Sequence, residues 1–413
     1  MTRNRRFGLF VALATLACTD TTLAPDARLV PSFAMDAGKH HTVVVNPNAN
    51  GNGIAATIQA GIDMVEPGGK VQVKAGTYTE TIVINKGLTI EAIGDGSEPV
   101  IVDPPGAPGA AILVTAVEPV IIRDLTVHRR GVVGVEAAGG VDLTLERVTI
   151  LAVQVPDATN SGMRLFNNSG LTGRRAHLLV RGSLIDGGGL PRSLGINLQA
   201  DVDAVLDGNV IVRSGAQCIR VVSHQPGALN VEIVNNHLDE CRPSLRFAVI
   251  DVGPVGPPLT PALPIGMTGV VNIVGNTIRN NGGSCFPTNA IRYELYTGRI
   301  ERNSIVDFLQ PCAQPTATAL PAAIWVGSLR GFSPASPVVR FNDILGNAQA
   351  GLRVAPNITT SLDARCNYWG SASGPSGVGT GTGDALVVQP GAATPVFAPF
   401  ATAPIAGTGA TGC

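Results

Sequence analysis

A repeat runs through most of this 413-residue chain. Its anchor positions lie mostly 23 to 27 residues apart, and they are Leu125, Val148, Ser183, Asn209, Asn236, Asn276, Asn303, Asn342 and Asn367. The residues five and three positions before each anchor, and two positions after it, are apolar, with Gly298 and Pro337 as the exceptions. A chain with this period folds by stacking one coil on the next rather than around one closed core.

Each repeat predicts three short strands. The apolar-x-apolar pattern before the anchor is typical of a strand with one buried face, and the apolar residue after the anchor begins a second strand. A third such segment follows in most coils, as in Ile219-Arg220-Val221 and Leu245-Arg246-Phe247. The 50 Gly and 30 Pro residues supply turns and exclude a mainly helical protein. We therefore predict an all-β protein of about ten three-strand coils, a parallel β-solenoid.

Six of the nine anchors are asparagine. Asparagine tolerates the left-handed backbone conformation that a tight turn needs, and its side chain can hydrogen bond to nearby backbone. Stacked asparagine side chains can also bond to one another. The pattern predicts a ladder of asparagine side chains at one turn of every coil.

Both ends of such a stack need a cover, because open strand edges pair with other chains. Apolar residues at Ile54, Ile58, Ile62 and Val65 predict an amphipathic helix that caps the first coil. We place the solenoid at residues 42–375 and interpret residues 376–413, which are rich in Gly, Ala, Thr and Pro, as a tail packed on the last coil.

The N-terminus is typical of an exported protein. Three arginines in the first six residues precede an apolar run over residues 7–17, which has the length of a signal peptide and is too short to span a membrane. The run ends in Thr15-Leu16-Ala17-Cys18, which resembles a bacterial lipobox and predicts lipidation of Cys18, with ordinary secretion as the alternative. Residues 1–18 are thus a signal peptide and residues 19–41 a tether. We expect a protein of the cell envelope or a secreted one, in contact with membrane only through its lipid.

Export affects how the other cysteines are interpreted. They are Cys218, Cys241, Cys285, Cys312, Cys366 and Cys413. An even number in an oxidising compartment predicts disulfides, and without close Cys or His spacings we expect no metal site. Cys285 and Cys312 follow their anchors by the same number of residues in adjacent coils, which predicts that they pair. Cys218 and Cys241 lie in adjacent coils at unequal offsets, and Cys366 with Cys413 follows by elimination.

Two segments carry a resemblance to known proteins. The entry segment contains Pro67-Gly68-Gly69-Lys70-Val71 and Ala75-Gly76-Thr77-Tyr78-Thr79-Glu80, and the chain later contains Cys366-Asn367-Tyr368-Trp369-Gly370. With these segments the chain resembles the pectin lyase-like right-handed parallel β-helix superfamily over residues 42–375. The resemblance implies a right-handed β-helix, in a superfamily that holds lyases, hydrolases, esterases, epimerases, adhesins and noncatalytic binders. The enzyme signatures of those families are incomplete here, so we interpret Tyr78, Glu80 and Trp369 as structural.

The middle residue of the third strand predicts a column on the outside of the solenoid. In successive coils it is Glu136, Arg164, Asn197, Arg220, Arg246, Arg292, Trp325 and Arg353. Guanidinium groups bind carboxylates and sulfates in a bidentate manner, so an arginine column predicts a surface for an anionic chain. The alternative is a solvated ladder that the protein's own acids neutralise, with Glu294, Glu240 and Asp251 as candidates.

We therefore expect a β-helix that binds or processes polysaccharide, preferably one containing uronates. The predicted substrate contacts are Arg164, Arg220, Arg246, Arg292, Trp325 and Arg353. If the protein is an enzyme, it is a polysaccharide lyase or a glycoside hydrolase, and Glu294, close to Arg292, is a candidate base. The alternative is a noncatalytic surface scaffold or adhesin. A cluster of two or three carboxylates on this face would favour the enzyme.

The remaining expectations concern partners. The net charge of −1 argues against nucleic acid, whose binding needs a basic excess. We expect a monomer without a cofactor. Calcium is the alternative for a lyase, and the sequence contains no motif for it.

Overall fold

The computed structural model describes residues 41–48, 54–94, 96–106, 109–153, 160–167, 169–223, 229–243, 247–254, 269–279, 289–307, 322–327, 335–347, 350–405 and 413. The chain divides into two units, residues 1–32 and 33–413, and all of these residues belong to the second. The predicted signal peptide, Cys18 and nearly all of the tether lie outside the described residues. Within the described residues, no helix is both long enough and apolar enough to cross a membrane.

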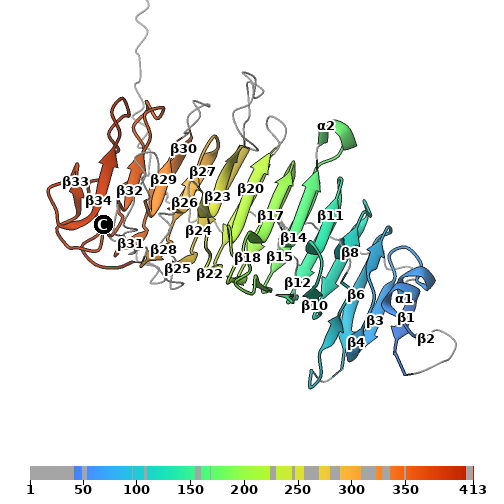
Figure 1. The fold of residues 1–413 in the computed structure, drawn as a ribbon. Coiled ribbons are helices and arrows are strands. Elements are labelled where there is room, and N and C mark those ends of the chain that lie inside the picture. Colours follow the sequence, from blue (N-terminus) through green and yellow to red (C-terminus); the bar gives the residue numbers. More distant parts are fainter. Residues whose placement is uncertain are drawn as a thin grey trace, which may run out of the picture. The chain divides into compact units, whose positions relative to one another are not determined.

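The strands of the described residues form three sheets, named A, B and C here (Figure 1). In stacking order, sheet A consists of β2 (Ile54–Ala55), β1 (Thr42–Val45), β3 (Lys70–Lys74), β6 (Leu88–Ile93), β9 (Pro119–Arg123), β12 (Asp142–Glu146), β15 (Ala176–Arg181), β18 (Val202–Asp207), β21 (Leu229–Val234), β24 (Gly269–Val274), β27 (Thr297–Glu301) and β30 (Ser336–Arg340). Sheet B consists of β4 (Gly76–Tyr78), β7 (Val100–Val102), β10 (Thr126–Arg129), β13 (Thr149–Ala152), β16 (Leu184–Asp186), β19 (Val210–Val212), β22 (His237–Asp239), β25 (Thr277–Arg279), β28 (Ser304–Val306) and β31 (Asp343–Leu345). Sheet C consists of β5 (Ile82–Ile84), β8 (Ala110–Val114), β11 (Val133–Ala138), β14 (Asn160–Asn167), β17 (Ser193–Ala200), β20 (Ile219–Ser223), β23 (Ala248–Pro254), β26 (Asn289–Tyr293), β29 (Ile324–Val326), β32 (Leu352–Val354), β34 (Gly383–Val388) and β33 (Pro375–Gly377).

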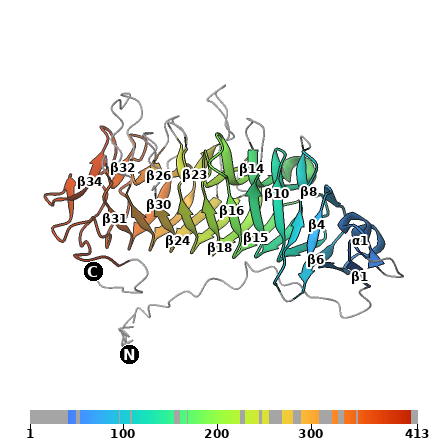
Figure 2. The same ribbon diagram turned by 60° about the horizontal axis from the view of Figure 1, so that its bottom comes forward.

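The chain passes from sheet A to sheet B to sheet C in each coil and then begins the next coil. Neighbouring strands pair in parallel, for example β18 with β21, β19 with β22 and β20 with β23. Colours in Figure 1 therefore change in chain order along the stack, and the turned view of Figure 2 shows strands of successive coils side by side. The predicted right-handed parallel β-helix is confirmed.

Alternating aliphatic residues of all three sheets fill the inside of each coil. In one coil Val231 and Ile233 of β21 and Leu238 of β22 are fully buried, as are Ile219 and Val221 of β20 in the coil before it. Such stacking buries every second side chain of each strand and leaves the others on the outside. Function can therefore reside in the outward residues without disturbing the core.

The predicted asparagine ladder is present at the turn between sheets A and B. From Asn236 to Asn367, the amide oxygen of each ladder residue accepts two hydrogen bonds from the asparagine of the preceding coil, one from its backbone nitrogen and one from its Nδ2. For Asn276 and Asn303 both distances are 3.0 Å. The Nδ2 of Asn276 also donates to the backbone oxygen of Ile233 in the preceding coil, at 2.8 Å. The ladder runs from Asn209 to Asn367 and continues to the hydroxyl-bearing Ser183, whose backbone nitrogen donates to Asn209.

The left-handed conformation predicted for the anchors belongs instead to the residue before each anchor. These residues have φ between 51° and 69°, and they are Asp124, Arg147, Gly182, Gly208, Asn235, Gly275, Arg302, Phe341 and Cys366. The bend and the side-chain ladder are thus made by consecutive residues. Because most of the bending residues are not glycine, we conclude that the ladder and the stacked coils hold them in a conformation they would otherwise avoid.

Gly298, an exception to the apolar pattern, is explained by a side chain of sheet C. A Cβ at Gly298 would lie 2.0 Å from the backbone oxygen of Val271 and 2.7 Å from the Tyr293 hydroxyl. That hydroxyl is buried and donates to the oxygens of Val271 and Thr297 at 2.7 and 2.6 Å. The ring of Tyr293 therefore takes the space that an aliphatic side chain occupies in other coils.

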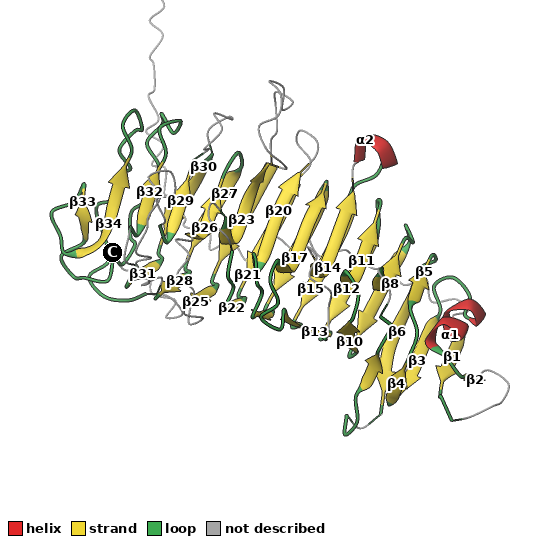
Figure 3. Ribbon diagram, in the orientation of Figure 1, coloured by secondary structure: helices red, strands yellow, loops and turns green. Residues whose placement is uncertain are grey.

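The N-terminal end is capped as expected, by a shorter helix than predicted (Figure 3). Helix α1 covers Ile58–Met64, because Ile54–Ala55 pairs with β1 instead. The carboxylate of Glu80 accepts hydrogen bonds from the backbone nitrogens of Ile58 and Gln59 at 2.7 and 2.9 Å. The side chain of Gln59 bonds both the nitrogen and the oxygen of Val83 and so covers the first strand of sheet C. A second helix, α2 (Ser169–Thr172), is a single short turn.

The structural interpretation of Tyr78 is also supported. Its side chain is 3% exposed and its hydroxyl donates to the backbone oxygen of Lys74 at 2.8 Å. Burial, together with the charge of Glu80, raises the pKa of Tyr78 to about 12. The hydroxyl therefore stays protonated and serves packing of the first coil.

The C-terminal end continues the stack into the segment interpreted as a tail. Strand β34 pairs with β32, and single bridges join Asp363 to Val396 and Tyr368 to Ala401. Trp369 is fully buried, in agreement with its interpretation as a core residue.

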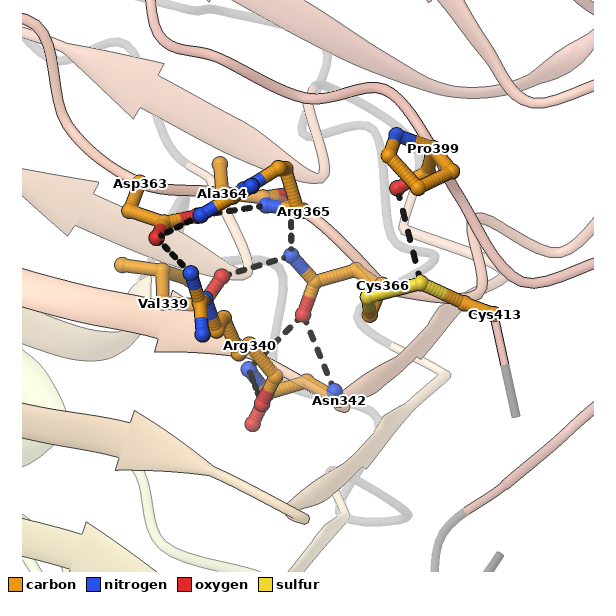
Figure 4. Close-up of a disulfide and its surroundings, with 10 residues drawn as sticks. Val339, Arg340, Asn342, Asp363, Ala364, Arg365, Cys366, Pro399 and Cys413 are labelled. Carbon is orange, nitrogen blue, oxygen red and sulfur yellow. Dashed lines mark hydrogen bonds and ion pairs between the residues drawn. A yellow bond between two sulfur atoms is a disulfide. The ribbon is translucent and has the colours of Figure 1, made fainter. Parts of the chain in front are cut away.

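Two disulfides join parts of the described chain. Cys366 is bonded to Cys413 beside the ion pairs of Asp363 with Arg340 and Arg365 (Figure 4). Cys218 is bonded to Cys241. Both pairs were predicted. The predicted Cys285–Cys312 pair lies outside the described residues.

Candidate functional site on the outer face of sheet C

The outer face of sheet C carries a column of residues in strict register. In stacking order they are Leu113, Glu136, Arg164, Asn197, Arg220, Asp251, Arg292, Trp325, Arg353 and Val387. Five of the six predicted contacts stand in this column, namely Arg164, Arg220, Arg292, Trp325 and Arg353.

The position predicted for Arg246 is occupied by Asp251. The strand of this coil is Ala248–Pro254, and Asp251 pairs with Arg220 on one side and Arg292 on the other. Ile250 and Val252 are fully buried and fill the inward positions. Two β-branched residues suit a strand better than the Leu245/Phe247 pair that the prediction used. Arg246 itself lies outside the described residues.

At the N-terminal end of the column, Arg164 is neutralised by the protein. Its Nη2 and Nε lie 2.6 and 3.2 Å from Oε1 of Glu136, the residue one coil earlier. About a third of the Arg164 side chain is exposed (34%). An exposed pair of this kind is a surface ladder rung and leaves little charge for a ligand.

Arg292 is the centre of a buried cluster. Its Nε lies 2.6 Å from Oδ1 of Asp251, and its Nη1 lies 3.4 Å from Oε1 of Glu294. The side chains of both acids are 2% exposed. Burial alone would lower the pKa of Arg292, but the charges of Asp251 and Glu294 and the hydrogen bond to Asp251 raise it above its usual value. Arg292 is therefore a fixed cation between two buried carboxylates.

Two further groups hold this cluster in place. The Nε2 of Gln217 donates to the second oxygen of Asp251 at 3.2 Å. The Arg292 guanidinium stands over the ring of Phe247, with its carbon 5.5 Å from the ring centroid, which adds a cation–π contact. For Arg292 the alternative of a neutralised ladder is correct, through two of the three acids named for it. The third, Glu240, follows β22 of sheet B.

Arg220 differs from Arg292. No carboxylate of the described residues forms an ion pair with it, and its buried Nε has no hydrogen-bond partner there. It stands between Asn197 and Asp251 in the column, and both oxygens of Asp251 are engaged by other side chains. Burial lowers the pKa of Arg220, and the charge of Asp251 only partly opposes this.

Arg353 is more isolated still. It is 6% exposed and stands between Trp325 and Val387, so its neighbours along the column are apolar. Its buried Nε has no partner among the described residues, and burial lowers its pKa. A buried cation without a counter-ion is costly, so Arg353 is a candidate contact for an anionic ligand.

Trp325 is not an open platform for a sugar ring. Only 4% of its surface is exposed, and it belongs to a small apolar cluster with Ala322, Ala350 and Ala355, against which Val387 packs. The cluster lies on the outside of sheet C, separate from the main core. Its contribution is to exclude water beside Arg353.

Sequence reasoning named Asp251 only as an acid that could neutralise the column, so its own place in the column was missed, and Gln217 was missed altogether. Asp251 stands between Ile250 and Val252 and thus has the same apolar-x-apolar signal as the other outward residues. Gln217 precedes the disulfide-bonded Cys218 and carries no comparable signal. In the described part of the chain, no group of three or more His, Cys, Asp and Glu side chains could hold a metal ion.

Comparison with protein-family models found no match. No curated protein matches the chain either. Among solved structures it is similar to an alginate lyase from Paenibacillus sp. str. FPU-7, with 14% identity, a TM-score of 0.46, and coverage of 79% of this chain and 97% of the lyase. It is also similar to the Dettilon tailspike protein, with 15% identity, a TM-score of 0.47, and coverage of 78% and 62%. A GH136 lacto-N-biosidase from Eubacterium ramulus shows 11% identity, a TM-score of 0.43, and coverage of 76% and 64%. The chain thus spans less than two thirds of the tailspike and of the biosidase.

Proposed function

We propose that the outer face of sheet C binds an acidic polysaccharide and that the Asp251–Arg292–Glu294 cluster cleaves it. One observation carries the proposal: Arg220 and Arg353, whose buried Nε atoms have no hydrogen-bond partner and which form no ion pair with a described residue, stand on either side of a buried pair of carboxylates. A ligand with anionic groups would supply the missing counter-ions through charge-assisted hydrogen bonds.

The geometry favours hydrolysis over elimination. In an elimination, an arginine beside the base neutralises the uronate carboxylate so that the adjacent proton can be removed. Arg292 is the cation beside Glu294, but it is already paired with Asp251 and Glu294. Hydrolysis needs two carboxyl groups near one glycosidic bond, and these two residues supply them.

The two carboxyl groups suit different roles. Asp251 accepts hydrogen bonds from Arg292 at 2.6 Å and from Gln217 at 3.2 Å, which fix its position, and we assign it to accept a proton from water. Glu294 is buried and farther from Arg292, which suits the group that donates a proton to the glycosidic oxygen as the carbon–oxygen bond breaks. The oxygen of water forms a bond to the sugar carbon as the glycosidic carbon–oxygen bond breaks. Asp251 takes the proton that water loses, and the leaving oxygen takes the proton that Glu294 gives.

A noncatalytic scaffold or adhesin is the second candidate. It is favoured by the ion pairs themselves, because carboxylates that Arg292 already holds are not free for chemistry unless a substrate displaces them. In that case the same face binds glycan and releases no product.

We further propose that the protein works outside the cytoplasm, held by a lipid on Cys18. The Cys218–Cys241 and Cys366–Cys413 disulfides support an oxidising compartment. Metabolic labelling with a fatty acid tests the anchor: label should enter the wild type and not Cys18→Ser, and an unlabelled wild type would indicate a secreted protein.

A glycan screen with matched variants tests the central proposal. Purified protein is titrated with acidic and neutral polysaccharides, and the release of reducing ends and of unsaturated uronates is followed. We expect reducing ends without unsaturated products, loss of cleavage with retained binding in Glu294→Gln, and unchanged cleavage in the control Glu301→Gln of sheet A. Unsaturated products would establish elimination instead. Binding without cleavage would support the scaffold, and no binding to any glycan would overturn the proposal.

A further inference from the structure

The charges along the outer face of sheet C are unevenly compensated, and this pattern limits what can lie across it. Arg164 is paired with Glu136, and Arg292 is paired with Asp251 and Glu294. Of the four arginines in the column, Arg220 and Arg353 form no ion pair with a described residue, and the buried Nε of each has no hydrogen-bond partner there. The face therefore offers two separate places for an anion rather than a continuous positive strip.

The register gives the separation of these two places. Arg353 is four strands further along the stack than Arg220, through Asp251, Arg292 and Trp325. At about 4.8 Å per strand this is about 19 Å.

The stretch between them disfavours further negative charge. It contains the carboxylates of Asp251 and Glu294 and the apolar surface around Trp325. An acidic group placed there would be repelled by Asp251 and Glu294 or would lose its hydration without compensation.

We propose that the ligand is an acidic heteropolysaccharide whose anionic groups are separated by neutral sugars, with two successive anions about 19 Å apart at Arg220 and Arg353. A homopolymer of uronates is the wrong ligand, because it would place carboxylates against Asp251 and Glu294. The inference rests on the proposed function and narrows the expectation that any uronate-rich chain would bind.

Three polysaccharides distinguish spacing from charge. Polygalacturonate carries a carboxylate on every sugar. Deacylated gellan carries one uronate in each tetrasaccharide repeat, and its carboxyl-reduced form is a neutral chain with the same backbone. Full-length protein is titrated with each by calorimetry at low and high salt. We expect gellan to bind at least about tenfold more tightly than the other two, with an affinity that falls as salt rises.

Variants assign the two anions. Arg220→Met and Arg353→Met should each lower the affinity for gellan at least about tenfold and leave the affinity for the reduced chain unchanged. Arg181→Met on sheet A, a cation paired with Asp207, is the matched control and should change neither. Polygalacturonate binding as tight as gellan, or an unchanged affinity in either variant, would overturn the spacing while leaving glycan binding intact. Failure of all three chains and of the wider screen would overturn the proposed function itself.

Discussion

The outer faces of sheets A and C belong to the same solenoid but differ in whether their cations have ion-pair partners. On sheet A, cations stand next to acids in adjacent coils: Glu91 pairs with Lys70 and Arg123, and Asp207 pairs with Arg181, whose side chain is 47% exposed. On sheet C, Arg353 is buried, Arg220 is half-buried with a buried Nε, and no described acid forms an ion pair with either. The fold makes the same demand on both faces, so the difference does not arise from stacking. It agrees with the proposal that sheet C is the binding face.

Removal of Arg292 should show the largest contrast between the two faces. Arg292→Ala leaves Asp251 and Glu294 buried without their cation, and we expect a loss of about 3–5 kcal/mol in the free energy of unfolding. Arg181→Ala on sheet A breaks an exposed pair and should cost about 0–1 kcal/mol. Chemical denaturation of both variants measures the difference, and similar losses would remove the distinction between the faces.

The asparagine ladder lies on neither outer face, so its variants give a reference loss of stability for the comparison of the two faces. Asn276→Ala removes hydrogen bonds to Ile233, Asn236 and Asn303, so we expect a loss of about 2–3 kcal/mol. Ser183→Ala should cost less, because its hydroxyl donates only to the oxygen of Arg181 and accepts only from the nitrogen of Val148. Equal shifts in thermal unfolding would contradict the view that the ladder amides carry the turn.

Replacement of the isolated cation should change stability in the opposite direction from a paired one. Arg353→Met removes a buried charge that no described acid pairs with and keeps an apolar stem beside Trp325, so we expect a gain of about 1 kcal/mol. Arg123→Met on sheet A breaks the pair with Glu91 and should lose about 0.5 kcal/mol. A destabilised Arg353→Met would mean that the protein itself compensates this arginine.

The smallest expected effect is on the pH dependence of the free energy of unfolding, through Glu91 of sheet A. Burial would raise the pKa of Glu91, but the hydrogen bond from Gln72 and the charges of Lys70 and Arg123 lower it below its usual value. A carboxyl with a lowered folded pKa stabilises the protein above its unfolded pKa of about 4.3, and this contribution is lost as the pH falls through the folded value. Glu91→Gln should therefore weaken the acid dependence of unfolding below about pH 4, by less than about 1 kcal/mol. If the stability of Glu91→Gln falls with acid in the same way as that of the wild type, Glu91 contributes nothing to the pH dependence of unfolding.

The fold could be predicted because its information is local and repeated. Each coil carries the same apolar spacing, and the ladder residues Asn209 to Asn367 stand at one fixed place in it. The bending residue before each anchor could not be predicted, since Phe341 and Cys366 have no intrinsic preference for a left-handed backbone. Stacking imposes it.

The site was only half predictable, for a physical reason. Outward positions are located only by the apolar residue on each side, and a coil with an insertion offers more than one such apolar-x-apolar triplet. The choice of Arg246 over Asp251 followed from this and turned a mixed cluster into a supposed row of cations. Whether an arginine has an ion-pair partner depends on neighbours one coil away, as Arg292 and Arg353 show, and no spacing within the sequence reveals it.

The most direct test of the account measures stability and affinity in the same protein. The double variant Arg220→Met/Arg353→Met removes from the column of sheet C the two arginines that form no ion pair with a described residue. We predict that this variant has a higher free energy of unfolding than the wild type and loses salt-dependent binding to the acidic glycan that the wild type prefers. A double variant that binds that glycan as tightly as the wild type, whatever its stability, would contradict the account.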